Sequence, residues 1–163
     1  MVISFIKRNK WKIVLVIFLI GCFLIYSVNS DERRAARLLN QAEKEYFLNQ
    51  NFNEAILLGN AVLNIQPDNY VAFYIRGLSK AALKDDRGAL SDLEEALRYA
   101  LANNREYSLS HMDSQQLMGE LYWTRGTLRW EQGIHVGGCN DWKIAAKYYN
   151  DPLAIELYEQ HCQ

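Results

Sequence analysis

Hydrophobic and polar positions follow two different patterns along this chain. From residue 13 to residue 28 the sequence reads IVLVIFLIGCFLIYSV, a stretch without a charge. Beyond residue 35, apolar residues recur every three or four positions with charged residues between them, which is the spacing of one helix face. The first pattern predicts a membrane-spanning helix, and the second predicts amphipathic helices that pack on one another.

The uncharged stretch 13–28 is a candidate membrane anchor. Extended by Trp11 and Lys12, it covers roughly 27 Å at about 1.5 Å per residue, against a bilayer core about 30 Å thick. A basic segment, residues 1–12, precedes it, and the positive-inside rule then predicts a cytoplasmic N-terminus, although three arginines on the far side weaken that signal. We therefore expect a single-pass membrane protein with a soluble domain on the non-cytoplasmic side. Residues 29–35 are expected to be a linker or an extension of the helix. The basic residues before the anchor are Lys7, Arg8, Lys10 and Lys12, and those after it are Arg33, Arg34 and Arg37.

A second interpretation concerns Cys22. The run Leu19-Ile20-Gly21-Cys22 resembles a bacterial lipobox, in which the cysteine is lipidated after cleavage before it. Residues 23–26 stay apolar, however, where lipoproteins usually turn small and polar, so an uncleaved anchor is favoured. Both interpretations leave the soluble domain that follows tethered to a membrane. We prefer to interpret Cys22 as an ordinary small apolar residue of a spanning helix.

The chain also repeats itself. RGLSKAALKDDRGALSDLEEAL (76–97) and RGTLRWEQGIHVGGCNDWKIAA (125–146) share Arg-Gly, Gly, Asp and Ala at the same internal positions. Ala55 and Ala89 are closer together than the starts of these two stretches, and Val62 and Ala96 are separated by the same number of residues as Ala55 and Ala89. These spacings predict three two-helix units over 36–69, 70–103 and 119–150, with an insertion at 104–118 that lengthens the second interval. Residues 151–163, with Pro152 in the first helical turn, are expected to form a capping helix.

The repeat resembles the tetratricopeptide repeat (TPR), whose motif of about 34 residues has an aromatic, Leu-Gly, Tyr, Ala, an aromatic, Ala and Pro. The resemblance implies an all-α fold: a transmembrane or signal-anchor helix, then a three-unit TPR-like helical solenoid over 36–163 that includes a C-terminal cap, as in a membrane-anchored bacterial-type TPR protein. The first copy departs from the motif at Glu43 and Gly59. The matching positions are Leu39, Tyr46, Ala55, Val62 and Pro67; then Phe73, Gly77, Ala89, Leu93 and Ala96; then Tyr122, Gly126, Gly138, Trp142 and Ala145.

In the TPR family the first helices of the units line a concave groove that receives a peptide. Aromatic residues at such positions dominate interface energetics. The alternative is that Trp123 and Trp130 pack under the insertion. A receptor for chaperone C-terminal tails is not expected, because only Asn40 and Lys44 resemble the residues that such receptors use. The groove positions that the resemblance assigns include Arg37, Asn40, Lys44, Phe47, Leu48, Tyr74, Leu78, Trp123, Thr127 and Trp130.

Cys139 and Cys162 lie at similar distances from the expected turn at Asn150-Asp151. Residues equidistant from the turn of an antiparallel helix pair face each other. The two thiols could therefore form a disulfide in an oxidising compartment. The alternative is two buried free thiols.

The sequence offers little for catalysis or nucleic-acid binding. The net charge of −1 carries no basic excess for phosphates. The glycines at 133, 137 and 138 lack the Gly-Lys-Ser/Thr ending of a phosphate-binding loop, and no His-Glu-x-x-His occurs. A zinc site from His135, Cys139, His161 and Cys162 is disfavoured, because adjacent residues rarely point at one ion. The recurrence of Asp92 and Asp141 indicates repeat structure rather than a catalytic carboxylate pair.

We therefore expect no enzyme, metal or cofactor, but a membrane-tethered adaptor or scaffold that binds a protein or peptide partner in an aromatic groove. The alternative is an accessory structural subunit of a membrane or envelope complex, in which the spanning helix is the interaction element. The sequence leaves homo-oligomerisation open.

Overall fold

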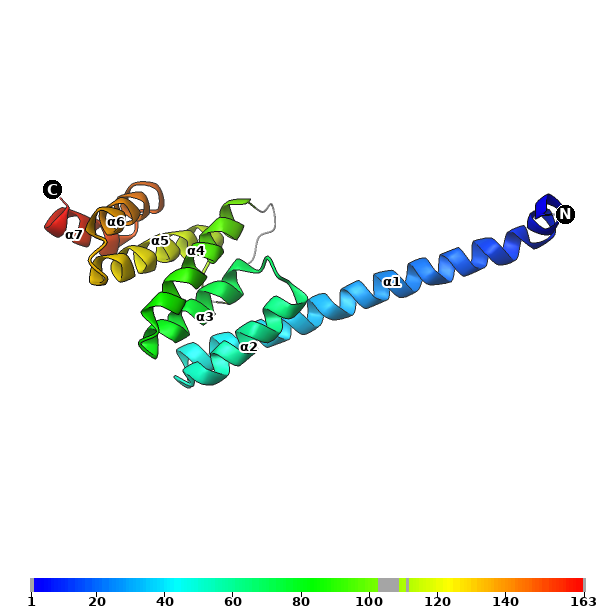
Figure 1. Ribbon diagram of the computed structural model, residues 1–163, viewed down its shortest axis with the longest axis horizontal. Coiled ribbons are helices and arrows are strands. Elements are labelled where there is room, and N and C mark those ends of the chain that lie inside the picture. The colour runs from blue at the N-terminus through cyan, green and yellow to red at the C-terminus, as the bar shows by residue number, and fades with distance from the viewer. Residues whose placement is uncertain (1, 103–108, 111, 163) are drawn as a thin grey trace. The chain divides into compact units, whose positions relative to one another are not determined.

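The computed structural model describes residues 2–102, 109–110 and 112–162, with side chains from residue 14 onward. The described part is all-helical, as expected; besides its helices it contains one isolated β-bridge, between Leu109 and Met112. Figure 1 shows the helices in chain order. They are α1 (Val2–Phe47), α2 (Phe52–Ile65), α3 (Tyr70–Ala82), α4 (Asp86–Ala102), α5 (Ser114–Glu131), α6 (His135–Tyr149) and α7 (Pro152–His161).

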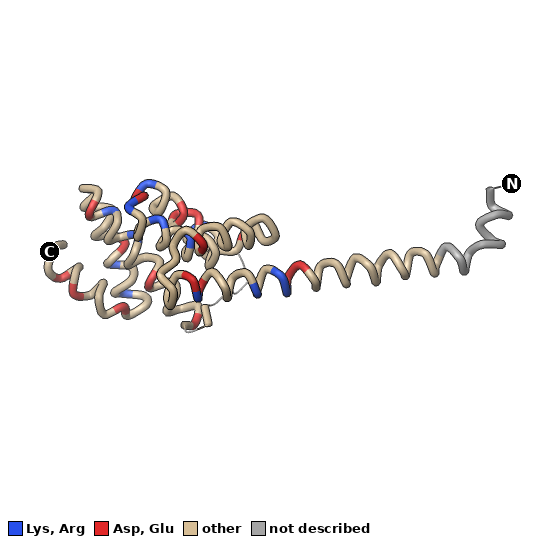
Figure 2. Tube along the Cα trace, turned by 90° about the horizontal axis from the view of Figure 1, so that it is seen from below, with Lys and Arg blue, Asp and Glu red and all other residues tan. Residues whose placement is uncertain are grey.

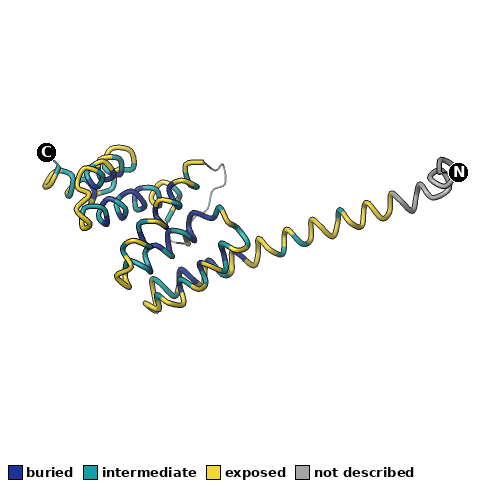
Figure 3. Tube along the Cα trace, in the orientation of Figure 1, coloured by how far each residue is buried: buried dark blue, intermediate teal, exposed yellow. Residues whose placement is uncertain are grey.

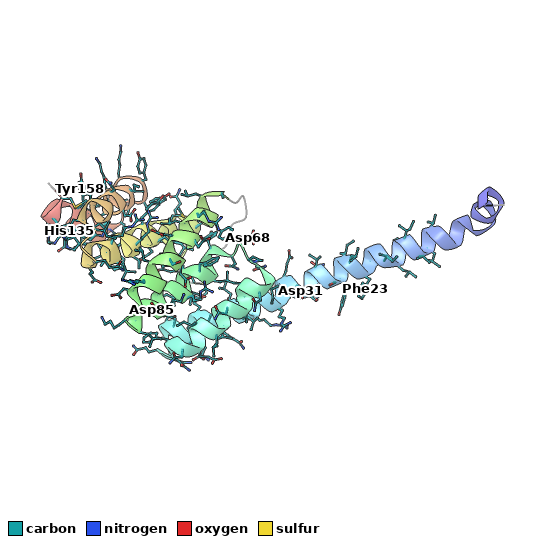
Figure 4. The ribbon with its side chains drawn as sticks, viewed as in Figure 1. Phe23, Asp31, Asp68, Asp85, His135 and Tyr158 are labelled. Atoms are coloured by element: carbon teal, nitrogen blue, oxygen red, sulfur yellow. A yellow bond between two sulfur atoms is a disulfide. The ribbon has the colours of Figure 1, made fainter. Side chains whose placement is uncertain are left out.

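The chain divides into two units, Met1–Arg34 and Ala35–Gln163. In the first unit, the apolar side chains from Val14 to Val28 are exposed along α1 (Figure 3), and Figure 2 shows no charge in this stretch. The side chain of Phe23, labelled in Figure 4, is 69 % exposed. The described part of α1 is long and apolar enough to cross a membrane. Residues 29–35 are helical, whereas the side chains of the basic segment 1–12 lie outside the described residues.

In the second unit each helix from α2 to α6 packs on the next helix in the sequence (Figure 1). Small residues stand where paired helices touch. A Cβ atom on Gly77 would lie 3.3 Å from the Cβ of Asp92, and one on Gly126 would lie 2.7 Å from Cδ1 of Trp142. The two glycines of the repeated Arg-Gly sequence therefore allow α3 to approach α4, and α5 to approach α6.

A buried ion pair joins α3 to α4. Arg76 donates from Nε and Nη2 to the two carboxylate oxygens of Asp92, at 2.8 and 2.5 Å. Lys80, one turn further along α3, places Nζ 2.8 Å from the same carboxylate. The Asp92 side chain is only 5 % exposed, so two cations compensate one buried negative charge.

The same arrangement recurs at the repeat-related positions of α5 and α6. Arg125 donates to both carboxylate oxygens of Asp141, at 2.9 and 2.6 Å, and Arg129 Nη1 donates to the same group at 2.9 Å. The guanidinium groups also lie over aromatic rings of their own helices, Arg76 over Phe73 at 5.1 Å and Arg125 over Tyr122 at 5.6 Å. The recurring aspartates are thus used in helix pairing. We call these two groups of side chains the Asp clamps.

The α1–α2 pair lacks an Asp clamp. The positions of the first repeat that correspond to Arg76 and Asp92 hold Ala42 and Leu58, which cannot form an ion pair. An aromatic contact joins the two helices instead, because the centre of the Tyr46 ring lies 5.6 Å from that of the Phe52 ring of α2.

The departure from the repeat motif at Gly59 also has a physical cause. A Cβ atom at Gly59 would lie 3.4 Å from the Cβ of Arg76. A larger side chain on α2 would therefore press against the stem of the arginine that forms the first Asp clamp.

The helix pair that corresponds to the third predicted repeat, 119–150, begins earlier in the chain than the repeat spacing predicts. Helix α5 starts at Ser114 rather than near residue 119, because Asp113 caps it: its carboxylate accepts from Gln116 N at 2.8 Å, and Gln116 Oε1 accepts from Asp113 N at 3.2 Å. The part of the expected insertion 104–118 from Ser114 onward is therefore helical, while 104–108 and 111 lie outside the described residues. At the other end, α7 begins with Pro152 in its first turn, as expected.

We expect Asp141→Ala to destabilise the protein by about 3 kcal/mol, because it leaves Arg125 and Arg129 without their buried carboxylate. This value is the lower end of the range for a buried pair, since the two arginines are 15 and 21 % exposed. Asp92→Ala should cost a similar amount. Urea unfolding of the full chain in detergent, followed by circular dichroism, measures both.

The matched control for the Asp clamps is Glu95→Ala, which removes a surface ion pair with Arg98. Its unfolding midpoint should stay close to that of the wild type. Equal midpoints for all three variants would show that the Asp clamps do not hold the helix pairs together.

Candidate functional site

A pocket of about 420 Å³ opens at the C-terminal end of α1, within the second unit. Four of its lining residues are groove positions that the TPR resemblance assigned to the first repeat. Phe47 and Leu48 are 39 and 74 % exposed, so the pocket offers apolar surface to a ligand. The lining residues are Asn40, Glu43, Lys44, Phe47, Leu48 and Ser110. We call this site the α1 pocket.

A buried carboxylate forms part of the α1 pocket. Glu43 is 7 % exposed, and Ser110 N lies 3.1 and 3.2 Å from its two carboxylate oxygens. The Ser110 hydroxyl also donates to Glu43 Oε1. Glu43 is notable in the sequence, because it stands where the repeat motif has a small residue. Ser110 lies far along the chain, between the second and third predicted repeats. Nothing in the sequence around it marks it as a pocket residue.

The segment that carries Ser110 is held on both sides. Leu109 is 4 % exposed and belongs to the hydrophobic core, and it pairs with Met112 in the isolated β-bridge. Met112 also packs against the core, and Asp113 then caps α5. We call residues 109–112 the pinned turn; of these, residue 111 lies outside the described residues.

Tyr74 does not lie on an accessible groove surface, because it is only 3 % exposed. Burial raises the pKa of its phenol well above the ordinary value, and the Glu120 carboxylate raises it further. Its electrostatic neighbours include Tyr46 of α1 and Glu120 of α5, and it belongs to the cluster of buried residues that forms the core. The prediction that Tyr74 contacts a partner is therefore corrected: it belongs to the core.

Two α5 residues of the predicted groove, Thr127 and Trp130, contact the helices that follow. Thr127 Oγ1 accepts from Trp142 Nε1 at 3.3 Å. The Trp130 ring lies 4.2 Å from the ring of His135, 5.3 Å from that of Trp142 and 5.1 Å from that of His161. Trp130 thus packs against α6 and α7, and neither Thr127 nor Trp130 lines the α1 pocket.

The remaining predicted groove residues differ in exposure. Arg37 is exposed on α1, and Leu78 of α3 packs, partly buried, against the core. Trp123 is also partly buried against the core, and its indole N–H finds no acceptor among the described residues. None of the three lines the α1 pocket.

The cysteines fall into two classes. Cys139 and Cys162 form a disulfide with a Cα–Cα distance of 5.6 Å, which ties the end of α7 to the first half of α6. Because both sulfur atoms belong to the disulfide, neither can bind a metal ion as a thiolate while the disulfide is intact. Within the described ranges no group of three or more His, Cys, Asp and Glu is placed to hold a metal ion. Cys22 is a free, exposed cysteine.

A second pocket, of about 430 Å³, lies where the start of α5 meets the turn between α6 and α7. The sequence does not predict it, since its residues come from two separate stretches, 112–120 and 149–152, that share no motif. The lining residues are Met112, Gln116, Gly119, Glu120, Tyr149, Asn150, Asp151 and Pro152.

No protein-family model matches the chain, and no curated protein matches it.

We expect reduction of the Cys139–Cys162 disulfide to lower the stability of the domain. The chain-entropy model gives about 3 kcal/mol for a loop of this size. The loss should be largest at α7, in which Ala154 is the only buried residue. Urea unfolding with and without reductant measures the total, and hydrogen exchange of α7 locates it.

Two variants make this test specific. Cys139→Ser combined with Cys162→Ser should show the lower stability at once and no further response to reductant, while Cys22→Ser should behave like the wild type. A wild-type midpoint that does not move on full reduction would contradict the expectation.

Proposed function

We propose that this chain is a membrane-anchored adaptor of the TPR type. Residues 13–28 hold the protein in a membrane, and the α1 pocket captures a segment of a protein partner. The observation that carries the proposal is the pocket itself: exposed Phe47 and Leu48 lie beside Asn40 and Lys44. Concave sites that combine apolar area with a few polar groups are the usual form of a ligand site.

The repeated contacts support the TPR assignment. Repeat-related positions make the same interactions: the Asp clamps, the rings of Phe73 and Tyr122, and the close approaches at Gly77 and Gly126. Units that repeat in such detail stack naturally into a solenoid, in which each unit covers the apolar face of its neighbour. On this proposal the units are 36–69, 70–103 and 119–150, and α7 is the cap.

The chemistry of the pocket points to a peptide rather than to a nucleic acid or a small anion. Phe47 and Leu48 offer a hydrophobic contact for a partner's apolar side chain. The Asn40 amide can both donate and accept hydrogen bonds, as the backbone of a peptide requires. The Lys44 ammonium can attract a nearby carboxylate of the partner. Anchoring would raise the local concentration of this site at the membrane.

We place the domain on the non-cytoplasmic side. The basic residues 7, 8, 10 and 12 precede the apolar stretch, which favours a cytoplasmic N-terminus. The Cys139–Cys162 disulfide requires an oxidising compartment, which the non-cytoplasmic side of the membrane provides. Two independent features therefore support the same orientation.

This orientation predicts the thiol state in cells. When cells that express the full chain are quenched in acid and alkylated, Cys139 and Cys162 should be protected until reductant is added, as measured by mass spectrometry. Cys22 serves as the internal control for a thiol that is not in a disulfide. Finding Cys139 and Cys162 alkylated without reduction would place the domain in a reducing compartment.

The adaptor function predicts a partner contact at the α1 pocket. A photoreactive benzoylphenylalanine in place of Phe47 should give one discrete heteromeric adduct in membranes, and Lys44→Glu should reduce its yield several-fold. Tyr148, which is 66 % exposed on α6, is the matched control position and should give none.

Two other outcomes decide against capture at this pocket. Adducts of equal yield from positions 47 and 148 would mean unspecific labelling. A discrete adduct from position 23 of the spanning stretch alone would favour an accessory subunit that interacts through its membrane helix.

A further inference from the structure

The second pocket, between the start of α5 and the turn that joins α6 to α7, differs from the α1 pocket in its charge. It contains the carboxylates of Glu120 and Asp151, and none of its described lining residues is Lys or Arg. In the α1 pocket, by contrast, Lys44 stands beside Glu43. We call the second pocket the acidic pocket. A cavity lined by one sign of charge concentrates ligands of the opposite sign, so the acidic pocket favours a cation.

The two carboxylates act on the same region of the domain. Both raise the pKa of the buried Tyr74 phenol, after the larger effect of its burial, and Glu120 does so more strongly than Asp151. Asp151 Oδ1 accepts from Ala154 N at 2.8 Å, so the N-terminus of α7 compensates part of the charge of Asp151. Glu120 stands in the second turn of α5, beyond the first turn in which a helix dipole acts. The pocket therefore keeps a negative charge.

A glycine keeps one side of the acidic pocket open. A Cβ atom on Gly119 would lie 3.1 Å from the Cβ of Tyr149 and 3.7 Å from Oδ2 of Asp151. Oδ2 is the oxygen of Asp151 that does not cap α7. This oxygen therefore borders the space that Gly119 leaves free, where a bound group can reach it. The site requires no free carboxylate, because each carboxylate can accept several hydrogen bonds.

An aromatic wall completes the acidic pocket. The Tyr149 ring is stacked on the ring of Tyr122, with 5.8 Å between their centres, so its orientation is fixed within the domain. A cation on an aliphatic stem can lay that stem along such a ring while its charged end faces the carboxylates. Asn150, which is exposed at the rim, adds an amide that can both donate to and accept from a peptide backbone.

We propose that the acidic pocket binds an organic cation, a guanidinium or ammonium group on an aliphatic stem, between Tyr149 and the carboxylates of Glu120 and Asp151. This chemistry is presented by an arginine or lysine side chain of a protein and by a free polyamine. The amide of Asn150 favours the side chain, since a peptide also presents its backbone. The acidic pocket shares no lining residue with the α1 pocket, so the adaptor function can fail without it and the reverse.

The test observes the pocket through its own methionine. The chain has three methionines, of which Met112 lines the acidic pocket. The full chain, with isotope-labelled methionine methyl groups, is studied by NMR in nanodiscs of uncharged lipid, and Met112→Leu assigns the signal. N-acetyl-arginine methylamide should shift the Met112 signal saturably, with a dissociation constant on the order of a millimolar, and should leave the Met1 signal in place. The citrulline analogue, which has the same shape without the charge, should bind about tenfold more weakly.

Variants of the two carboxylates test their roles. Glu120→Gln and Asp151→Asn each remove a charge and nearly preserve the shape, and Asn is as good a helix cap as Asp. Each should weaken the binding of the arginine probe about fivefold. Glu159→Gln is the matched control, because it removes the same charge from an exposed position of α7 outside the pocket, and it should leave the affinity unchanged.

Spermidine, titrated in the same way, separates the two sources of the cation. Tighter binding of the arginine probe supports a protein side chain, and tighter binding of spermidine supports a free polyamine at the same site. The proposal is overturned if the Met112 signal does not respond to either cation. It is also overturned if the citrulline analogue binds as well as the arginine probe, or if the affinity is the same in Asp151→Asn as in the wild type.

Discussion

The fold of the domain depends on one constraint: a buried negative charge must be matched. Asp92 and Asp141 are almost fully covered, and each is held by an arginine in bidentate contact and by a second cation one turn away. An unpaired buried charge destabilises the fold by more than the intact ion pair stabilises it. The ion pair therefore mainly fixes how the two helices are aligned, because sliding one helix along the other would leave the carboxylate without its cations. The glycines beside these residues then set how closely the helices approach.

The same constraint explains how far the sequence could predict the fold. The helices and the repeat spacing were predicted from the periodicity of apolar residues. The start of the last helix was predicted from Pro152, because proline is favoured in a first helical turn. The sequence showed that Asp92 and Asp141 recur, but it did not show that they form ion pairs. Predicting an ion pair between two helices requires the position of each helix along the other, which the sequence does not give. The start of α5 at Ser114 was missed, since the Asp113–Gln116 cap falls inside the segment that the repeat spacing marks as an insertion.

The candidate site was predicted only in part, and for a related reason. Positions on α1 such as Asn40, Lys44 and Phe47 could be assigned by their place in the repeat, and they do line a pocket. The same rule does not describe Tyr74, which is buried in the core, or Trp130, which packs against rings of α6 and α7. A position in a repeat defines a face of its own helix. It does not define what other segments cover that face.

The location of the pocket follows from where the Asp clamps are absent. The α3–α4 and α5–α6 pairs are held by a buried ion pair, whereas the α1–α2 pair has ring contacts such as that between Tyr46 and Phe52. The contact between Glu43 and Ser110 joins α1 to the segment before α5 instead. The α1–α2 pair therefore lacks the buried charge that opposes sliding in the other two pairs. The α1 pocket thus lies at the end of the one helix of these pairs that carries exposed Phe47 and Leu48 where the others carry an Asp clamp.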